Sequence, residues 1–239
     1  MRDAVIVIPT YNEIENIEAI IRAVFSQKKA FDILVVDDNS PDKTADKVKF
    51  LQNEFNQQLH LLVRTKKTGL GTAYIEGFKW ALQRDYNYIF EMDADFSHNP
   101  KDLIRLYNAC SVDGADMSIG SRYVTGVNVI NWPMSRVLMS YAASKYVRFI
   151  TRMNICDTTA GFVCYKRKVL EEINLNSVKF VGYAFQIEMK FKAYLKKFKI
   201  IEVPVIFTDR TKGKSKMSGG IISEAIFGVI KLKFKSLIS

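Results

Sequence analysis

The sequence predicts an α/β fold in which a mostly parallel sheet is covered by helices on both faces. Apolar runs of strand length alternate with segments of helical period through the first half of the chain. Polar motifs stand where several of the predicted strands end. Right-handed crossovers between parallel strands place helices on both faces of the sheet, so this alternation is typical of such a fold.

The individual elements follow from this alternation. Ile14, Ile17, Ile21 and Val24 recur at helical spacing and predict the first helix. The predicted strands of the first half are 4–8, 33–36, 60–63, 88–92 and 117–120, and the predicted helices are 13–26, 44–55, 72–84 and one that begins at Pro100.

The alternation stops after Arg122, where a loop rich in Gly and Asn follows. The predicted elements beyond it are a helix over 133–150, a strand over 161–165, a helix over 184–197 and a strand over 201–207. No repeat, low-complexity run or linker marks a second domain.

The last twenty residues predict an amphipathic helix, which divides the chain into a domain over 1–219 and an appendage over 220–239. Its apolar stripe comprises Ile222, Ile226, Val229, Ile230, Phe234 and Leu237, with Lys231, Lys233 and Lys235 beside it. This helix is too charged to span a bilayer. Either the stripe packs on the domain, or the helix lies on an anionic membrane surface, which the lysines favour.

The composition narrows the class of partner. The chain has 239 residues, is 48% hydrophobic and carries a formal net charge of +10, so anionic partners are expected. The sequence shows no nucleic-acid motif, and the basic excess lies between Lys190 and Lys235, beside the apolar helix. These features favour membrane phosphates and argue against nucleic acid.

The cysteines and the N-terminus indicate a cytoplasmic protein. Cys110, Cys156 and Cys164 lack the spacing of a disulfide framework or a zinc site. The apolar run at 4–8 has only strand length before Pro9, so it is no secretory signal.

Three motifs at predicted strand ends favour a nucleotide site, because open α/β sheets bind ligands at the carboxyl edge. In residues 9–13, Tyr11 can stack on a base and Glu13 can accept hydrogen bonds, although this segment also suits a simple helix start. In residues 35–44, Asp37 and Asp38 point to opposite sides of the strand, and one can accept from uracil or guanine. The capping of the next helix by Asp42 and Thr44 is the structural alternative.

The third motif, over 92–100, contains Asp93 and Asp95 after a buried strand. Two carboxylates separated by one small residue can hold a divalent cation that also binds a nucleotide diphosphate. We interpret the nearby His98 as structural.

A fourth set of residues is cationic. Arg122, Arg136 beside Trp132, and the basic stretch 209–216 lie on loops rich in Gly and Ser or at helix starts. Such groups can bind phosphate and close over a ligand, or can form a solvated basic turn.

These motifs together resemble family 2 glycosyltransferases with a GT-A-type, Rossmann-like fold, and within them the dolichyl- or polyprenyl-phosphate mannose synthases. The resemblance covers nearly the whole chain. The matching segments are 9–13 (PTYNE), 36–42 (VDDNSPD), 69–73 (GLGTA), 92–100 (MDADFSHNP), 120–123 (GSRY), and Asp209-Arg210 with Ser215-Lys216.

The resemblance implies roles for particular residues. The nucleotide pocket would be lined by Pro9, Tyr11, Glu13, Val36 and Asp38, with Asp93, Ala94 and Asp95 at the diphosphate. Mg²⁺ or Mn²⁺ would be held by Asp93, Asp95 and Ser97, and Asp95 is the expected direct ligand. Arg122, Arg210 and Lys216 would bind donor or acceptor phosphate, and Arg136 the acceptor phosphate. Asp95, Arg122 and Arg136 would be the catalytic residues.

The resemblance also implies the reaction: inverting transfer of mannose from GDP-mannose to dolichyl or polyprenyl phosphate, at the cytoplasmic face of a membrane. Attachment would use amphipathic helices or a small membrane-anchor subunit, as in relatives without a transmembrane part. The alternatives are transfer of glucose from UDP-glucose to the same lipid and a nucleotide-binding regulator without turnover. A Rossmann dehydrogenase is disfavoured, because the 69–71 segment lacks the phosphate fingerprint and follows the third strand.

Overall fold

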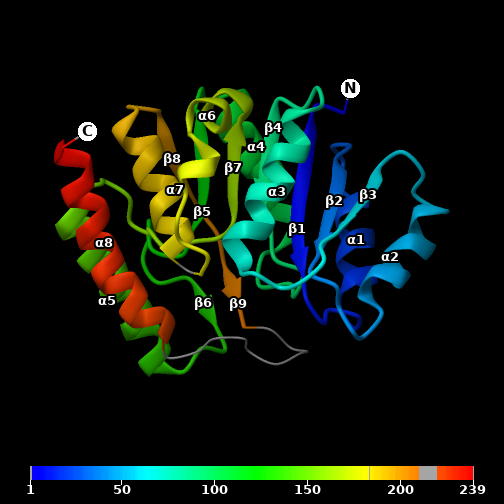
Figure 1. Ribbon diagram of the computed structural model, residues 1–239, viewed down its shortest axis with the longest axis horizontal. Coiled ribbons are helices and arrows are strands. Elements are labelled where there is room, and N and C mark those ends of the chain that lie inside the picture. Colours follow the sequence, from blue (N-terminus) through cyan, green and yellow to red (C-terminus); the bar gives the residue numbers. More distant parts are fainter. Residues whose placement is uncertain (1, 183, 210–219, 239) are drawn as a thin grey trace.

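The computed structural model of the protein describes residues 2–182, 184–209 and 220–238, and within the last segment the side chains of 227–236. A seven-stranded sheet forms its centre (Figure 1). From one edge to the other, the strands are β3 (Leu59–Val63), β2 (Asp32–Asp37), β1 (Ala4–Thr10), β4 (Tyr88–Glu91), β7 (Val163–Lys166), β5 (Met117–Ser121) and β8 (Ile200–Pro204). Only β7 pairs antiparallel to its neighbours in this sheet. The predicted mostly parallel sheet is confirmed.

Helices cover both faces of the sheet, as the sequence predicts. Alternate residues of β1 point to opposite faces, so that Val5 and Val7 enter one apolar cluster while Ile6 and Ile8 enter the other. The first cluster lies under α3 (Leu70–Leu82), α5 (Met134–Thr151), α6 (Arg167–Glu172), α7 (Ala184–Leu195) and α8 (Gly220–Ile238), and the second under α1 (Ile17–Phe25), α2 (Thr44–Gln52) and α4 (Leu103–Ser111). Two 3-10 turns, Pro100–Asp102 and Leu175–Ser177, complete these layers.

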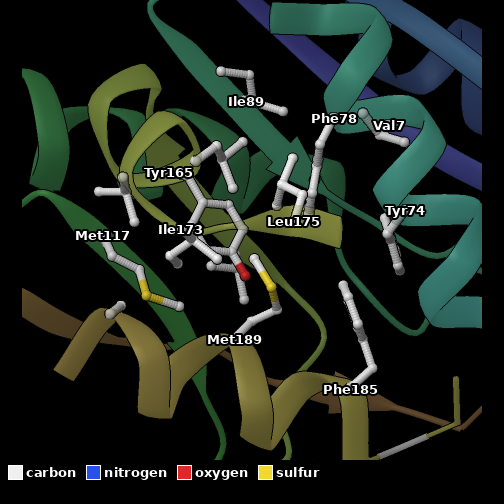
Figure 2. Packing of buried hydrophobic residues seen from close by; sticks show 14 of the residues in the cluster. Val7, Tyr74, Phe78, Ile89, Met117, Tyr165, Ile173, Leu175, Phe185 and Met189 are labelled. Atoms are coloured by element: carbon white, nitrogen blue, oxygen red, sulfur yellow. The ribbon is translucent and has the colours of Figure 1, made fainter. Parts of the chain in front are cut away.

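The first cluster fixes α3 tightly against the sheet. Figure 2 shows Tyr74 and Phe78 of α3 facing Phe185 of α7 and Tyr165 of β7. The Tyr74 and Phe185 rings stack with centroids 5.8 Å apart, and the Phe78 and Tyr165 rings meet edge to face at 5.5 Å. A Cβ at Gly77 would collide with a methyl group of Val7 in β1. The middle of α3 is therefore packed directly against β1 and β2.

Several element boundaries differ from the prediction for local reasons. The helix predicted from residue 13 begins at Ile17, because the Glu13 carbonyl accepts from the Asn16 and Ile17 amides and closes a turn first. The predicted strand over 201–207 divides into β8 and the short β9 (Phe207–Thr208). β9 pairs with β6 (Val129–Ile130), which lies in the segment predicted as a loop. Two-residue strands are too short to show a period in sequence.

The predicted C-terminal helix is present as α8, which packs beside α5 and α7 (Figure 1). The prediction that its apolar side chains form one stripe is wrong in part. Val229 is buried and Leu232 packs on the core, whereas Phe227 and Phe234 are 73% and 63% exposed. The helix therefore uses one side against the domain and presents aromatic side chains on another. In the part of the chain that the structure describes, no helix is both long and apolar enough to cross a bilayer.

Candidate active site

The polar motifs of the first half meet at the carboxyl edge of the sheet, after β1, β2 and β4, at the end of the molecule opposite the N-terminus (Figure 1). Each of these three loops contains a residue in the left-handed backbone region: Asn12 at φ 58°, Asn39 at φ 56° and Phe96 at φ 62°. Asparagine tolerates this conformation, whereas a bulky residue such as Phe96 is strained in it. The loop after β4 is therefore held in shape by its surroundings.

The two adjacent acids after β2 point to different sides, as predicted. Asp37 is fully buried and accepts hydrogen bonds from the Thr10 hydroxyl at 2.8 Å and from the Ser40 hydroxyl at 2.6 Å. It links the end of β1 to the loop after β2. Asp38 instead faces Arg64, whose Nη1 lies 2.8 Å from Asp38 Oδ1. Asp38 is therefore the acid with a second oxygen to offer a ligand.

The capping prediction for Asp42 and Thr44 is correct only in part. Lys43 occupies the N-cap position of α2 and makes no side-chain capping bond, but Asp42 accepts from the first amide of the helix. Asp42 accepts from the Thr44 amide and from the Ile14 amide, both at 3.0 Å, and Thr44 Oγ1 accepts from the Glu13 amide at 3.0 Å. Burial alone would raise the pKa of Asp42, but the hydrogen bonds from Thr44 and Ile14 leave it below its ordinary value. The start of α2 thus holds the loop after β1 in place.

The predicted nucleotide-pocket residues lie around these two loops. Tyr11 is half-buried, and the Lys67 ammonium lies 4.3 Å from the centroid of its ring. Glu13 accepts from the Asn16 side-chain amide at 3.1 Å. Pro9 is opposite Val36 in the sheet, and the Val36 side chain is fully buried in the core beside α3. Val36 can therefore meet a ligand only through its backbone.

The loop after β4 carries the predicted diphosphate and metal residues. Asp95 is 8% exposed, and its Oδ1 accepts from the Ser97 amide at 3.1 Å. Ala94 and Ser97 are buried, whereas the Asp93 side chain is 39% exposed. The Tyr74 hydroxyl of α3 donates to Asp93 Oδ1 at 3.4 Å. The structure thus places both carboxylates in one loop beside the start of α3.

His98 supports this loop. Its Nδ1 accepts from the Asp93 amide at 3.0 Å, and its ring stacks on Phe162 with centroids 4.9 Å apart. Burial, opposed by the charge of Asp95, lowers the pKa of His98 to about 4. The imidazole is therefore neutral at physiological pH, with its proton on Nε2, and this geometry agrees with the structural interpretation of the residue.

The oxygen donors of the loop suit a hard divalent cation. Asp93 and Asp95 contribute carboxylates and Ser97 a hydroxyl, the ligand chemistry that Mg²⁺ and Mn²⁺ prefer. Within the described residues, no group of three or more His, Cys, Asp and Glu side chains is arranged to hold an ion. Two carboxylates leave positions for water and diphosphate oxygens, so these residues fit a metal that binds together with its nucleotide.

Arg122, predicted to bind phosphate, is held by an acid that the sequence did not suggest. Asp157 is fully buried and accepts from Arg122 Nε at 2.7 Å, from Nη2 at 2.6 Å and from the Arg122 amide at 3.0 Å. The Arg122 charge and hydrogen bonds outweigh the effect of burial and lower the pKa of Asp157. Glu202 of β8 in turn accepts from the Cys156 and Asp157 amides. The guanidinium is thereby fixed in one orientation.

An aromatic cluster joins the cations to the diphosphate loop. The Phe207 ring lies 5.5 Å from the His98 ring and 5.2 Å from the Trp132 ring, both edge to face. The Arg122 and Arg136 guanidinium carbons lie 5.4 Å and 4.0 Å from the centroid of the Trp132 ring. Arg136 also pairs with Asp209 at 2.8 Å. The predicted catalytic arginines are therefore neighbours of the acidic loop.

A buried polar network lies behind this loop. Glu91 accepts from the Tyr165 hydroxyl at 2.8 Å and from the Gln186 side-chain amide. Lys190 donates to the Ala160 carbonyl at 2.6 Å. Burial raises the pKa of Glu91 to about 7 and lowers that of Lys190 to about 8. The network ties β4, β7 and α7 to the segment before β7 that carries Asp157.

The sequence analysis missed Asp157, Glu202 and Arg64. A single acid or arginine outside a motif carries no signal until its distant partner is known, and Asp157 meets Arg122 across 35 positions. Arg210 and Lys216, which the resemblance assigns to phosphate binding, lie outside the described residues.

Comparison with known proteins identifies relatives along the whole chain. The model of the family described as glycosyl transferase family 2 matches residues 5–174. A polyprenol monophosphomannose synthase of Mycolicibacterium smegmatis is 47% identical over 94% of this chain and 84% of its own length. An undecaprenyl-phosphate mannosyltransferase of Micrococcus luteus is 44% identical over 94% and 91%. A dolichol-phosphate mannosyltransferase of Pyrococcus furiosus is 36% identical over 95% of this chain and 62% of its own length.

Solved structures confirm the fold class. Glucosyl-3-phosphoglycerate synthase of Mycobacterium tuberculosis, crystallised with Mn²⁺, UDP and its product, aligns with a TM-score of 0.69 over 98% of this chain and 80% of its own. Its sequence identity is 15%, so the likeness concerns the fold alone.

Proposed function

Because the chain belongs to glycosyl transferase family 2 and is therefore a glycosyltransferase, we propose that it transfers mannose from GDP-mannose to the phosphate of a polyprenol, with inversion at the anomeric carbon. One arrangement carries the proposal: an acidic loop suited to a metal–diphosphate complex lies beside two arginines suited to a second phosphate, joined by one aromatic cluster. The names of relatives with 36–47% identity support mannose and a polyprenyl phosphate as the two substrates.

The donor side would bind the nucleotide through the loops after β1 and β2. Tyr11 offers an aromatic face to the base, and Asp38 offers a carboxylate oxygen to the N–H groups of guanine. A divalent ion held by Asp93 and Asp95 would supply charge that stabilises the departing diphosphate. Ser97 anchors Asp95 through its amide, so the carboxylate is already oriented before the nucleotide arrives.

The acceptor side would bind the lipid phosphate through Arg136 and Arg122. The second ionisation of a phosphate monoester lies near pH ~6, so the attacking oxygen is already anionic and needs no general base. Catalysis then depends on positioning and on neutralising charge. Asp157 positions Arg122 for that task, and the stacking of Arg136 on Trp132 orients its planar fork.

We further propose that α5 and α8 lie on the membrane that holds the acceptor. The two helices are neighbours and expose large apolar side chains, namely Met134, Leu138 and Phe149 of α5 with Phe227 and Phe234 of α8. Lys145, Lys231 and Lys235 are exposed on the same two helices. Apolar groups flanked by lysines suit an anionic lipid surface. The protein would then be peripheral on the cytoplasmic face of the membrane. The alternative to attachment through α5 and α8 is a small membrane-anchor subunit.

A transfer assay tests the reaction. Radiolabelled GDP-mannose and UDP-glucose are offered in parallel to polyprenyl phosphate in detergent, with Mg²⁺, Mn²⁺ or a chelator. Metal-dependent labelling of lipid from GDP-mannose, with the β-anomer as product, is the expected result. Labelling from UDP-glucose alone would overturn the choice of sugar and base, and an α-linked product would overturn inversion.

A further inference from the structure

Arg64 is a buried cation at the end of β3 that belongs to none of the sequence motifs. Its side chain is 6% exposed, and its amide donates to the Asp37 carbonyl at 2.8 Å, which extends the pairing of β3 with β2 by one residue. The guanidinium therefore starts from a fixed backbone point next to the loop after β2.

Every described contact of the guanidinium connects two parts of the donor side. Nη1 donates to Asp38 Oδ1 at 2.8 Å. Nη2 donates to Thr72 Oγ1 at 2.8 Å and also to Thr68 Oγ1, at the start of α3 and just before it. Nε lies 3.2 Å from Glu76, one turn further along α3. Arg64 thus joins Asp38 to the segment that contains the Gly69-Leu70-Gly71 motif.

Among the charges around Asp38, Arg64 is the main one that opposes its protonation. Burial raises the pKa of Asp38, and the like charges of Asp37 and Glu76 act in the same direction. Arg64 opposes them from 2.8 Å, and Lys67 opposes them from the exposed loop. Because Arg64 is buried and Lys67 is exposed, Arg64 is the larger and less screened of the two opposing charges.

We propose that Arg64 is a positioning residue of the donor site, which keeps the Asp38 carboxylate ionised and aimed at the nucleotide base and ties the start of α3 to it. The inference rests on the proposed function, since it takes Asp38 to be the acid that accepts hydrogen bonds from the base. An ionised carboxylate offers only acceptors, whereas a protonated one places a donor against the N–H groups of guanine. Arg64 acts through Asp38 and needs no contact with the substrate.

The test is the affinity for GDP with Mg²⁺, measured by calorimetry from about pH 8 down to about pH 6 on the full chain. Arg64→Gln, Arg64→Lys, Asp38→Asn and the double variant Arg64→Gln/Asp38→Asn are compared with the wild type. Arg105→Gln is the matched control, since Arg105 also pairs with an aspartate, Asp102, but lies exposed on α4.

The wild type and the control should bind GDP almost equally across this range. Arg64→Gln should bind roughly tenfold more weakly, with the loss growing as the pH falls, because the pKa of Asp38 rises further once the charge of Arg64 no longer opposes burial. Arg64→Lys keeps a charge but lacks the fork, so its affinity should fall without a new pH dependence. Asp38→Asn and the double variant should bind equally weakly, because the arginine acts through the acid.

The donor KM should follow the same order while kcat at saturating donor changes less than about twofold, since the residue serves binding of the donor. Circular dichroism and thermal melting confirm the fold of each variant, and Arg64→Lys carries the test if Arg64→Gln does not fold.

The outcomes separate this inference from the proposed function. A wild type that binds neither GDP nor UDP would overturn both. If the wild type binds GDP and Arg64→Gln binds it equally at every pH, only the inference fails. Losses from Arg64→Gln and Asp38→Asn that simply add in the double variant would likewise overturn it, because two independent contacts would then explain the data.

Discussion

The proposed donor and acceptor sides of this site are held together in different ways. On the donor side, three acids accept hydrogen bonds from amides or hydroxyls close in sequence: Asp95 from Ser97, Asp42 from Thr44, and Asp37 from Ser40. Asp38 is the exception, because its partner Arg64 is 26 positions away. On the acceptor side, cations are fixed by acids far along the chain. Arg122 meets Asp157 across 35 positions and Arg136 meets Asp209 across 73.

The difference follows from the chemistry of the ligands. A loop that binds a cation must present anionic oxygens, and backbone amides at strand ends and helix starts orient them locally. A surface that binds phosphate must present arginines, whose long side chains need a distant acid or an aromatic face to hold them still. Local contacts therefore orient several acids of the donor side, with Asp38 and its distant partner Arg64 as the exception, whereas the arginines of the acceptor side depend on tertiary contacts throughout.

The largest effect is expected on the donor side. Asp95→Ala removes the buried carboxylate of the acidic loop and should lower mannosyl transfer by about a thousandfold or more, with little change in the melting temperature. Transfer from GDP-mannose at several Mg²⁺ concentrations measures this. Activity that remained near wild type would show that the acidic loop does not hold the metal.

The acceptor side should respond through stability as well as activity. Asp157→Asn leaves Arg122 buried without its counter-charge and should lower the free energy of unfolding by about 3 kcal/mol and transfer by roughly a hundredfold. Asp209→Asn is the contrasting variant, because its pair with Arg136 is partly exposed and should contribute less than about 1 kcal/mol. Urea denaturation of both variants checks this, and equal losses would contradict the difference in burial.

The pH dependence of stability sharpens the comparison at His98, which lies between the two sides. Its pKa is lowered from 6.5 to about 4. Between these pH values, His98 is protonated in the unfolded chain but neutral in the folded protein. The stability from this group is present above about pH 6.5 and is lost as the pH falls toward about 4, by about 3 kcal/mol in total.

His98→Asn keeps an acceptor for the Asp93 amide but cannot titrate. Denaturation across this pH range should therefore show a shallower fall in stability for the variant than for the wild type. Glu91, whose raised pKa favours the folded state at low pH, is common to both proteins and cancels in the difference. If the stability of the variant and of the wild type fell in parallel, the pKa of His98 would be the same in the folded and unfolded states, which would contradict this prediction.

The smallest effect is expected at the membrane surface that we propose for α5 and α8. Replacing Phe227 and Phe234 of α8 by Ser removes two exposed aromatic side chains and should weaken binding to vesicles that contain anionic lipid by roughly tenfold. Phe50→Ser on α2 is the matched control, since Phe50 is 67% exposed on the opposite face. Equal binding by all three proteins in a sedimentation assay would refute the proposed membrane surface.

The sequence alone determined the parts of this protein that depend on local order. The alternation of strand and helix predicted the sheet, and the positions of Asp38, Asp93 and Asp95 after strands predicted their common edge. The hydrogen bond from the Thr44 amide to Asp42 at the start of α2 was also foreseeable, because it joins residues two positions apart. Such features are encoded in short segments, where period and spacing are visible.

Only the tertiary structure decided which charges meet. It paired Arg122 with Asp157 and Arg64 with Asp38, and it turned Val229 inward while Phe227 and Phe234 stayed exposed. A buried cation is stable only beside an acid, yet any of many acids in the sequence satisfies that rule. The choice among them follows from the packing of distant strands and helices, which no short segment records.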